Sequence, residues 1–411
     1  MLKTYYDGRE TRKPADREAG LMAALPRILH HAKSKSASYG RILADIDPQT
    51  VNSRDGLAKL PVTRKSDLID AQAKKPPLAG LNATPIPAMA RLFQSPGPIY
   101  DPQGKGDDWW RMGRAFFAAG FRPGDIVHNC LSYHLTPGGF IFDSGARACG
   151  CVVIPAGVGQ SEAQVKAISD LKPAGYSGTP SFLKILIEKA EELGSDISSI
   201  KRALVSGEAL PPALRDWFAE RDIEMLQCYA SADLGLIAYE SDAKGGMIVA
   251  EDIILEIVRP GTGEPVADGE VGEVVVTTLN MDYPLIRFAT GDLSAIANGL
   301  SPCGRTNDRI KGWMGRADQT TKVKGMFVHP QQVGEIVKRH PAIAKARLVV
   351  TRESDNDVMT LLCEGDQASA DINAIEETMA SVCKLRGVVA FNPAGTLPND
   401  GKVIDDRRDH S

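Results

Sequence analysis

The chain has 411 residues, of which 43% are hydrophobic and 24% are charged, and this length and composition are typical of a folded protein with more than one domain. Its 48 basic and 52 acidic side chains give a net charge of −4, which argues against a nucleic-acid partner because such proteins bind by neutralising phosphates. No apolar stretch reaches the roughly 18–20 residues that cross a bilayer, so no membrane partner is predicted.

The N-terminus and the cysteines indicate a cytoplasmic location. The start MLKTYYDGRETRKPADRE is polar and lacks the apolar core of a signal peptide. The seven cysteines are an odd number and form no C-x-x-C pair, which favours buried thiols in a reducing compartment over a disulfide framework.

The N-terminal part is predicted to be mostly helical. Apolar residues recur at helical spacing between residues 14 and 43, and Pro26 is expected to kink or restart that helix. The segment LPVTRKSDLIDA (60–71) predicts a short helix capped by Thr63 or Ser66.

Helical and strand patterns alternate between residues 108 and 275, which predicts parallel βαβ units. Ligands bind beyond the carboxyl ends of such strands. The informative residues are therefore expected in the loops after the strands: Tyr133-His134, Gly157, Ser206-Gly207-Glu208 and Tyr229 to Asp233.

The C-terminal part has two further patterns. Residues 252–296 read as antiparallel strands, and the tail after Asp318 alternates strands and helices over a length that suits a small independent domain. The predicted fold class is therefore α/β. It has a large N-terminal region of residues 1–317, with parallel-sheet subdomains and a β-rich portion, and a small α+β domain of residues 318–411.

Four short segments combine residue types that suit phosphate and ribose chemistry. RFATGDL (287–293) places an aspartate on a glycine turn, where its carboxylate can accept hydrogen bonds from two vicinal hydroxyls. GRADQTTKVKG (315–325) is cationic and flexible, SGEAL (206–210) ends a strand, and Lys402 lies in the loop LPNDGK. Taken singly, each also fits an ordinary alternative: a charged turn, a solvated linker, a helix N-cap or a surface lysine.

Taken in order, the segments SGEAL, CYASADLG, RFATGDL, GRADQTTKVKG and LPNDGK resemble the adenylate-forming superfamily of acyl-CoA ligases, and most closely its phenylacetate–CoA ligase branch. The resemblance extends over nearly the whole chain, including LPVTRKSDLIDA and FVHPQQVGEIV. It implies a large AMP-binding domain, a small mobile lid domain and the use of ATP, Mg²⁺ and coenzyme A. The implied reaction ligates a carboxylic acid, aromatic or otherwise bulky, to CoA through an acyl-adenylate, in a protein that forms a homodimer.

The same resemblance implies residue roles. Lys402 would bridge carboxylate and phosphate in the first step, and Asp233 would be the catalytic carboxylate that holds Mg²⁺. Asp292 would bind the ribose hydroxyls, Arg316 would assist at the ribose or phosphate, and Asp318 would be the hinge. The remaining implied residues are Gly207, Glu208, Ala209, Tyr229, Ala230 and Ser231 around the nucleotide, Lys324 and Gly325 in the thioester-forming state, and Tyr133, His134 and Gly138 in the acyl pocket.

The sequence departs from the family on the phosphate side. A Ser/Thr/Gly-rich loop is expected near residues 94–103, where FQSPGPIYDPQG carries prolines that lack N–H donors and Asp101, which would add negative charge. Ala232 stands at a hydroxyl position, and Asp233 is shorter than the usual glutamate. Three interpretations stay open: an ATP-dependent ligase with an altered phosphate site, a nucleotide- or CoA-binding relative without adenylation, and an enzyme of the thioester half-reaction alone.

Two other classes are disfavoured. No G-x-G-x-x-G motif follows the first strand of the βαβ region, which argues against a nicotinamide-dependent dehydrogenase. Cys303 has only Cys228 as a candidate neighbour and no cysteine-rich segment beside it, so no zinc site is predicted.

Overall fold

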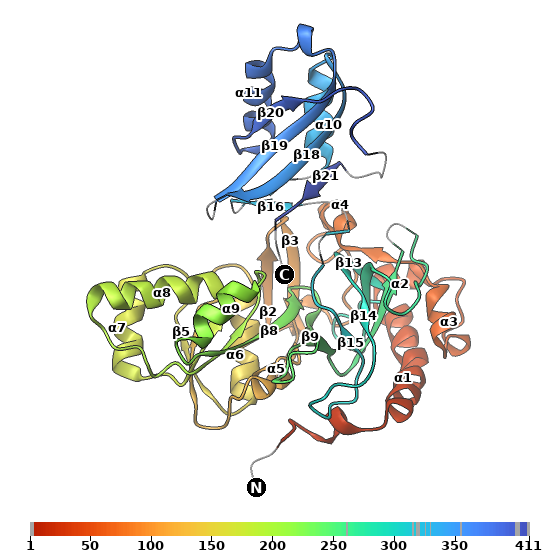
Figure 1. The fold of residues 1–411 in the computed structure, drawn as a ribbon. Coiled ribbons are helices and arrows are strands. Elements are labelled where there is room, and N and C mark those ends of the chain that lie inside the picture. Colours follow the sequence, from red (N-terminus) through yellow and green to blue (C-terminus); the bar gives the residue numbers. More distant parts are fainter. Residues whose placement is uncertain are drawn as a thin grey trace. The chain divides into compact units, whose positions relative to one another are not determined.

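The structure is a computed structural model, and it describes residues 4–259, 262–314, 316–317, 321–324, 326–328, 330–353, 356–398 and 403–408. It divides into two units, Met1–Trp313 and Met314–Ser411 (Figure 1). The described apolar residues form separate buried clusters in each unit. The sequence placed the domain boundary between residues 317 and 318.

The N-terminal segment is helical, as its periodicity predicted, but Pro26 does not restart the helix. α1 (Pro14–Lys35) continues through Pro26, and the break comes at Ser36, whose side chain accepts a hydrogen bond from the Tyr39 N–H at the start of α2 (Ala37–Ile42). α3 (Arg54–Ala58), α4 (Leu68–Lys74) and the short turns η1 (Gly8–Thr11), η2 (Pro48–Thr50), η3 (Lys65–Asp67) and η4 (Ile86–Ala88) complete this region.

A nine-stranded sheet forms the centre of the first unit, in the order β14-β15-β10-β9-β8-β7-β6-β4-β5. Five strands are parallel, as predicted: β4 (Ile126–Asn129), β5 (Val152–Pro155), β6 (Gly175–Gly178), β7 (Arg202–Val205) and β8 (Glu224–Ser231). Antiparallel strands extend the sheet beyond β8: β9 (Gly235–Tyr239), β10 (Met247–Val249), β14 (Ile296–Ala297) and β15 (Arg309–Ile310).

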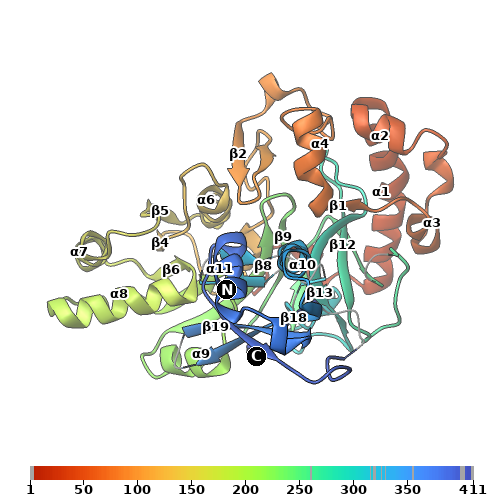
Figure 2. The same cartoon turned by 90° about the horizontal axis from the view of Figure 1, so that it is seen from above.

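Helices cover both faces of the parallel strands (Figure 2). The side chain of Asn129 bonds to the Gly139 carbonyl of α6 (Gly138–Ala148), whereas the preceding residue, His128, bonds to Gln164 of α7 (Ser161–Leu171). Successive residues of a strand point to opposite faces, so α6 and α7 lie on opposite faces of the sheet. The other helices are α5 (Gly113–Ala118), α8 (Pro180–Leu193) and α9 (Pro212–Ala219).

Two smaller sheets contain the strands of the N-terminal segment, β1, β2 and β3. β11 (Ile253–Val258), β12 (Gly272–Thr278) and β13 (Phe288–Ser294) form the antiparallel sheet predicted for residues 252–296. The two-residue strand β1 (Thr63–Arg64) pairs with β13 in parallel. β2 (Arg91–Ser95) and β3 (Ile99–Gln103) form a separate hairpin.

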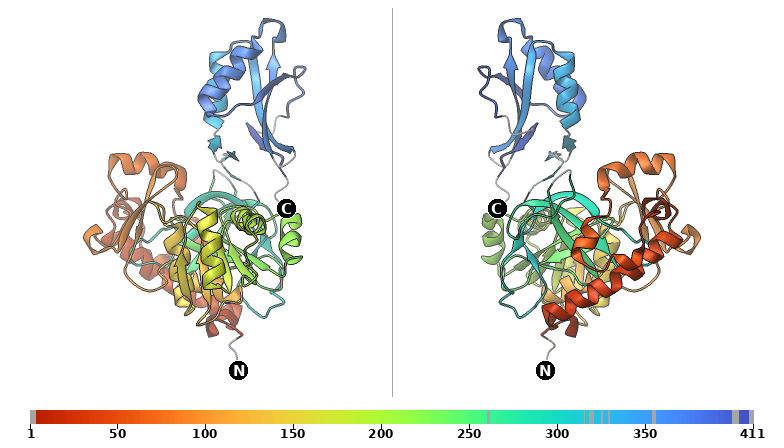
Figure 3. Two further views of the ribbon diagram at one scale, coloured as in Figure 1. Left: turned by 90° about the vertical axis from the view of Figure 1, so that its left-hand side faces the viewer. Right: turned by 90° about the vertical axis from the view of Figure 1, so that its right-hand side faces the viewer.

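The second unit is a four-stranded sheet in the order β20-β19-β18-β21, and Figure 3 shows its two long helices on one face of that sheet. Its elements are the hairpin β16 (Thr321–Val323) and β17 (Met326–Val328), α10 (Pro330–Arg339), β18 (Ile343–Glu353), β19 (Asn356–Gly365), η5 (Gln367–Ser369), α11 (Ile372–Cys383), β20 (Val388–Phe391) and β21 (Ile404–Asp406). Within the described part of the chain, no helix has the length and apolar character needed to span a bilayer.

Candidate functional site

The carboxyl edge of the parallel strands contains a topological switch point. The chain leaves β4 to form β5 on one side and β6 on the other, and such a point opens a crevice at the carboxyl ends of the strands. Asn129 lies there: its amide nitrogen donates to the Tyr133 hydroxyl at 2.7 Å, and its oxygen accepts from the Ser177 hydroxyl at 3.0 Å. Sequence reasoning did not single out Asn129, because its side-chain hydrogen bonds join the loop after β4, α6 and β6, and local sequence does not show which elements meet.

The residues predicted for the acyl pocket lie in the loop after β4 and at the start of α6. The Tyr133 hydroxyl donates to Asp143, and its ring meets Phe140 edge-on at 5.1 Å between centroids. His134 is exposed, and Gly138 is the first residue of α6. The structure therefore brings these three residues to the carboxyl edge, with Tyr133 held in a hydrogen-bond network.

The predicted adenine segment follows β7 at the same edge. Gly207 has a φ of +83°, a left-handed conformation that glycine adopts without strain. The Glu208 carboxylate accepts from the Ser181 hydroxyl at 2.9 Å, and Ala209 is half-buried. The loop is thus held at the N-terminal end of α8. It follows β7, which lies beside β6 in the sheet, and β6 lies beside β4.

Tyr229 and Asp292 meet although 63 residues separate them. The Tyr229 hydroxyl, at the end of β8, lies 2.7 Å from the Asp292 carboxylate on β13 and 3.1 Å from the Thr290 hydroxyl. The indole N–H of Trp313 donates to the other Asp292 oxygen at 3.0 Å. This arrangement fixes a carboxylate at the edge where the sequence predicted a ribose site.

The rest of the β8 segment shapes the turn that leads to Asp233. Ala230 pairs with Leu236 of β9, and the Ser231 hydroxyl accepts a hydrogen bond from the Leu234 N–H at 3.2 Å. Ser231 therefore stabilises the turn from within, and its oxygen is already used by the backbone.

Asp233 is paired with a lysine that the sequence analysis did not assign to the site. The Lys65 ammonium, from η3, lies 2.6 Å from Asp233 Oδ2, and the Asp233 side chain is fully buried. The Asp101 carboxyl, on β3, is also fully buried and faces Asp233.

Burial and neighbouring charges shift the pKa values of Asp101 and Lys65. Burial, and then the charge of Asp233, raise the pKa of Asp101 well above its usual range. Burial alone would lower the pKa of Lys65, but the carboxylates of Asp233 and Asp101 raise it above its usual value. Lys65 and Asp233 form an ion pair, and the expectation that Asp101 adds negative charge stays a prediction.

A tight hairpin stands where the sequence analysis looked for a phosphate loop. Ser95 pairs with Ile99, so only Pro96, Gly97 and Pro98 connect β2 to β3. Proline has no N–H, which leaves the Gly97 N–H as the sole peptide donor of this connection. The hairpin cannot surround phosphate oxygens with backbone N–H groups as a glycine-rich loop does.

Arg287, which opens the RFATGDL segment, is structural. It is 1% exposed, and its guanidinium contacts both Glu256 oxygens, at 3.1 and 3.0 Å, together with the carbonyls of Ala58, Leu60 and Gly263. It joins the sheet of β11–β13 to the N-terminal segment.

The predicted residues of the second unit are only partly described. Arg316 is half-buried, and the exposed Lys324 has its backbone N–H bonded to Asp357 at 3.0 Å. Lys402, Asp318 and Gly325 lie outside the described residues. Their predicted roles therefore stay predictions.

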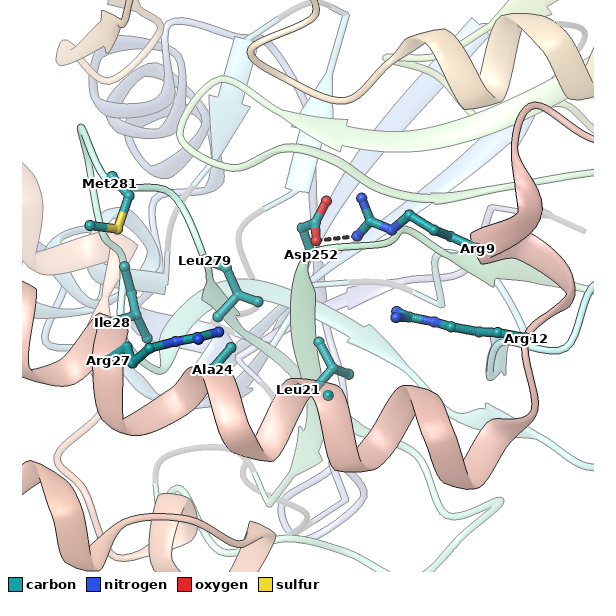
Figure 4. A pocket seen from close by; sticks show the side chains of 10 residues that line it. Arg9, Arg12, Leu21, Ala24, Arg27, Ile28, Asp252, Leu279 and Met281 are labelled. Atoms are coloured by element: carbon teal, nitrogen blue, oxygen red, sulfur yellow. Dashed lines mark hydrogen bonds and ion pairs between the residues drawn. The ribbon is translucent and has the colours of Figure 1, made fainter.

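A cavity of about 300 Å³ lies elsewhere, beside α1 (Figure 4). Arg9, Arg12 and Arg27 reach towards it over an apolar floor that includes Leu21 and Ile28, and Arg9 is paired with Asp252. None of its lining residues is a predicted site residue. The polar cluster at the carboxyl edge, not this cavity, is therefore the candidate site.

Comparison with known proteins identifies the family of the chain. Residues 109–281 match the family described as AMP-binding enzyme. The chain is 32% identical to a phenylacetate-coenzyme A ligase of Aromatoleum evansii, over 83% of this chain and 78% of that protein. It is 30% identical to the phenylacetate-coenzyme A ligase of Escherichia coli K12, over 98% of this chain and 95% of that protein.

A solved structure shares the fold. The crystal structure of a 2-hydroxyisobutyryl-CoA ligase with 2-HIB-AMP and CoA matches with a TM-score of 0.79 at 24% identity, over 99% of this chain and 93% of that chain. The identities to the curated ligases extend over most of both proteins. The chain therefore belongs to the phenylacetate–coenzyme A ligase family of adenylate-forming, AMP-binding enzymes.

Proposed function

We propose that the protein ligates a carboxylic acid to coenzyme A with ATP. The acid's carboxylate oxygen attacks the α-phosphorus, the bond to pyrophosphate breaks and an acyl-adenylate forms. The CoA thiol then loses its proton as its sulfur attacks the acyl carbon, and AMP leaves. The observation that carries this proposal is the Asp292 carboxylate, fixed by Tyr229 and Trp313 beside the Lys65–Asp233 pair at the carboxyl ends of β8 and β13.

The chain's own residues would divide the work between ribose and phosphate. A carboxylate held from behind can accept hydrogen bonds from two vicinal ribose hydroxyls, and such charge-assisted bonds are strong. Lys65 would supply positive charge where negative charge develops on the phosphate, which is the main requirement of adenylation. Lys402 and Arg316 would complete the cationic set, as the resemblance to the family implies.

Aromatic side chains near the acyl segment support an aromatic acid. Phe140 meets Tyr133 at 5.1 Å and Phe93 at 5.3 Å between ring centroids, and Arg91 lies 4.8 Å above the Phe140 ring. Aromatic rings favour edge-to-face partners at these distances.

Mg²⁺ and the oligomeric state complete the proposal. We assign Mg²⁺ to the phosphates of ATP, which would bring the ion into the site. We also propose that the protein forms a homodimer, which light scattering would test.

Acid-dependent exchange of labelled pyrophosphate into ATP tests the first step, and acyl-CoA formation tests the second. A panel of aryl and aliphatic acids should give exchange with at least one aryl acid, and exchange should be lost in Lys402→Ala. A wild-type protein that binds no adenine nucleotide and gives no exchange with any acid would exclude the ligase.

The β2–β3 hairpin favours a second candidate, an enzyme of the thioester half-reaction alone. With one peptide donor in the turn, the site offers little to the β- and γ-phosphates, which an acyl-adenylate lacks. A synthetic acyl-adenylate would then give acyl-CoA with the thiol, while ATP and the free acid would give no pyrophosphate. Equal competence in both assays would restore the complete reaction.

A further inference from the structure

The Lys65 ammonium lies among carboxyl groups that come from three distant parts of the chain. It precedes α4, whereas Asp233 follows β8 and Asp101 belongs to β3. Its Nζ lies 2.6 Å from Asp233 Oδ2, and Asp292 acts on it as a further negative charge. The Lys65 side chain is 27% exposed, whereas the side chain of Asp233, with which it pairs, is fully buried.

The residues present do not fit a resident Mg²⁺ at Asp233. Mg²⁺ requires six oxygen ligands in a nearly octahedral arrangement and keeps several of its waters. One oxygen of Asp233 is occupied by the ammonium, and the full burial of Asp101 and Asp233 leaves no access for a hydrated ion. The described residues contain no group of three or more His, Cys, Asp or Glu side chains that could hold a metal.

A further polar group near this cluster, the Tyr283 hydroxyl, is a donor rather than a metal ligand. The Tyr283 hydroxyl is buried and has no hydrogen-bond partner among the described residues. The charges of Asp101 and Asp233 both act on it. The carboxyls are therefore surrounded by an ammonium and a hydroxyl, which suit hydrogen bonding and not coordination.

We propose that Lys65 is the resident cation of the phosphate side of the site and takes the place of a divalent ion held by Asp233. This inference rests on the proposed function, because it requires that a nucleotide binds here. An ammonium has three N–H donors. One is used by Asp233, and two remain for phosphate oxygens, which offsets the single N–H of the β2–β3 turn.

Calorimetry with AMP tests the role of Lys65. Wild-type protein should bind AMP with the same affinity, within about threefold, in excess Mg²⁺ and in excess EDTA. Lys65→Met should weaken binding about 10- to 100-fold, by loss of a charge-assisted bond, and Lys65→Arg should retain it. Lys105→Met is the matched control, since Lys105 is an exposed cation just after the hairpin, and it should bind like wild type.

Titration of the nucleotide-free protein with Mn²⁺, followed by electron paramagnetic resonance, tests whether Asp233 holds a divalent ion in the absence of a nucleotide. Wild-type protein should give no stoichiometric Mn²⁺ binding. Stoichiometric binding that Asp233→Asn abolishes would overturn the inference and leave the proposed function standing, as would a tenfold loss of AMP affinity in EDTA. Absence of AMP binding under both conditions would instead overturn the proposed function.

Discussion

Asp292 is the single residue on which nucleotide binding most depends in this account. Its two oxygens are held by the Tyr229 hydroxyl and the Trp313 indole, so the carboxylate is positioned before a ligand arrives. Asp292→Asn removes the negative charge and should weaken AMP binding about 10- to 100-fold, because a hydrogen bond to a charged group contributes about 1.5–3 kcal/mol. Calorimetry measures this, with the exposed Asp268→Asn as control; equal losses in both variants would disprove a specific role.

Asp108 gives a pH-dependent prediction. Burial raises its pKa from 3.8 to about 6, and its carboxylate accepts a hydrogen bond from the Gly113 N–H at 3.0 Å. Because the folded pKa lies above the unfolded value, the stability that this group contributes is complete below about pH 4 and is lost as the pH rises through about 6.

Asp108→Asn removes that ionisation while keeping an acceptor for Gly113. Asn tolerates the positive φ of 49° at this position. Because Asp108 is partly exposed, we expect a stability gain of only about 1–2 kcal/mol near pH 7.5 and almost none near pH 4. Urea unfolding at the two pH values measures it, with the exposed Asp107→Asn as control. The same gain at both pH values would show that ionisation is not the cause.

Some residues of the site could be found from sequence and others could not. Asp292 and Tyr229 were predicted because their segments resemble motifs of the adenylate-forming family, and the structure brings the two side chains together. Lys65 was missed because its partner is 168 residues away, and its segment reads locally as the start of a short helix. The full burial of Asp101 was not predicted, because burial depends on the packing of other elements and not on the neighbouring residues.

At the scale of elements, α7 is tied to the sheet by one buried side chain. The side-chain oxygen of Gln164 accepts a hydrogen bond from the Cys130 thiol and is also hydrogen-bonded to the imidazole of His128 on β4. Its side-chain nitrogen donates hydrogen bonds to the carbonyls of Gly157 and Gly159. It therefore joins a helix, a strand and the loop after β5.

Gln164→Ala should lower the free energy of unfolding by about 2–4 kcal/mol, because several buried polar groups lose their partner. Glu162→Ala, an exposed change in the same helix, should cost less than about 0.5 kcal/mol. Urea denaturation compares them, and equal effects would show that helix propensity, and not the hydrogen-bond network, accounts for the loss.

The elements themselves were largely predictable. The five parallel strands and their helices lie within residues 108–275, where the alternating patterns predicted parallel βαβ units. The features that were not predicted depend on tertiary packing. α1 continues through Pro26. β14, β15 and β10 join the main sheet, although nothing in their sequences shows which sheet they belong to. Strand neighbours are chosen by packing, which local periodicity does not encode.

At the scale of the whole molecule, the two units have separate hydrophobic clusters, and Asp292, Tyr229, Lys65 and Asp233 all belong to the first. A shortened chain of residues 1–313 should therefore fold and bind AMP within about tenfold of the full chain. It should give no pyrophosphate exchange, because Lys402 is removed. Circular dichroism verifies folding, and exchange by the shortened chain would exclude a catalytic role for Lys402.

The central claim is that one nucleotide binds at the carboxyl edge of the first unit, between Asp292 and Lys65. A crystal structure of the protein with AMP tests it most directly. We predict ribose hydroxyls at hydrogen-bond distance, about 2.5–3.0 Å, from the Asp292 carboxylate and a phosphate oxygen beside the Lys65 ammonium. AMP bound in the cavity beside α1, or ribose hydroxyls that leave Asp292 without contact, would contradict the account.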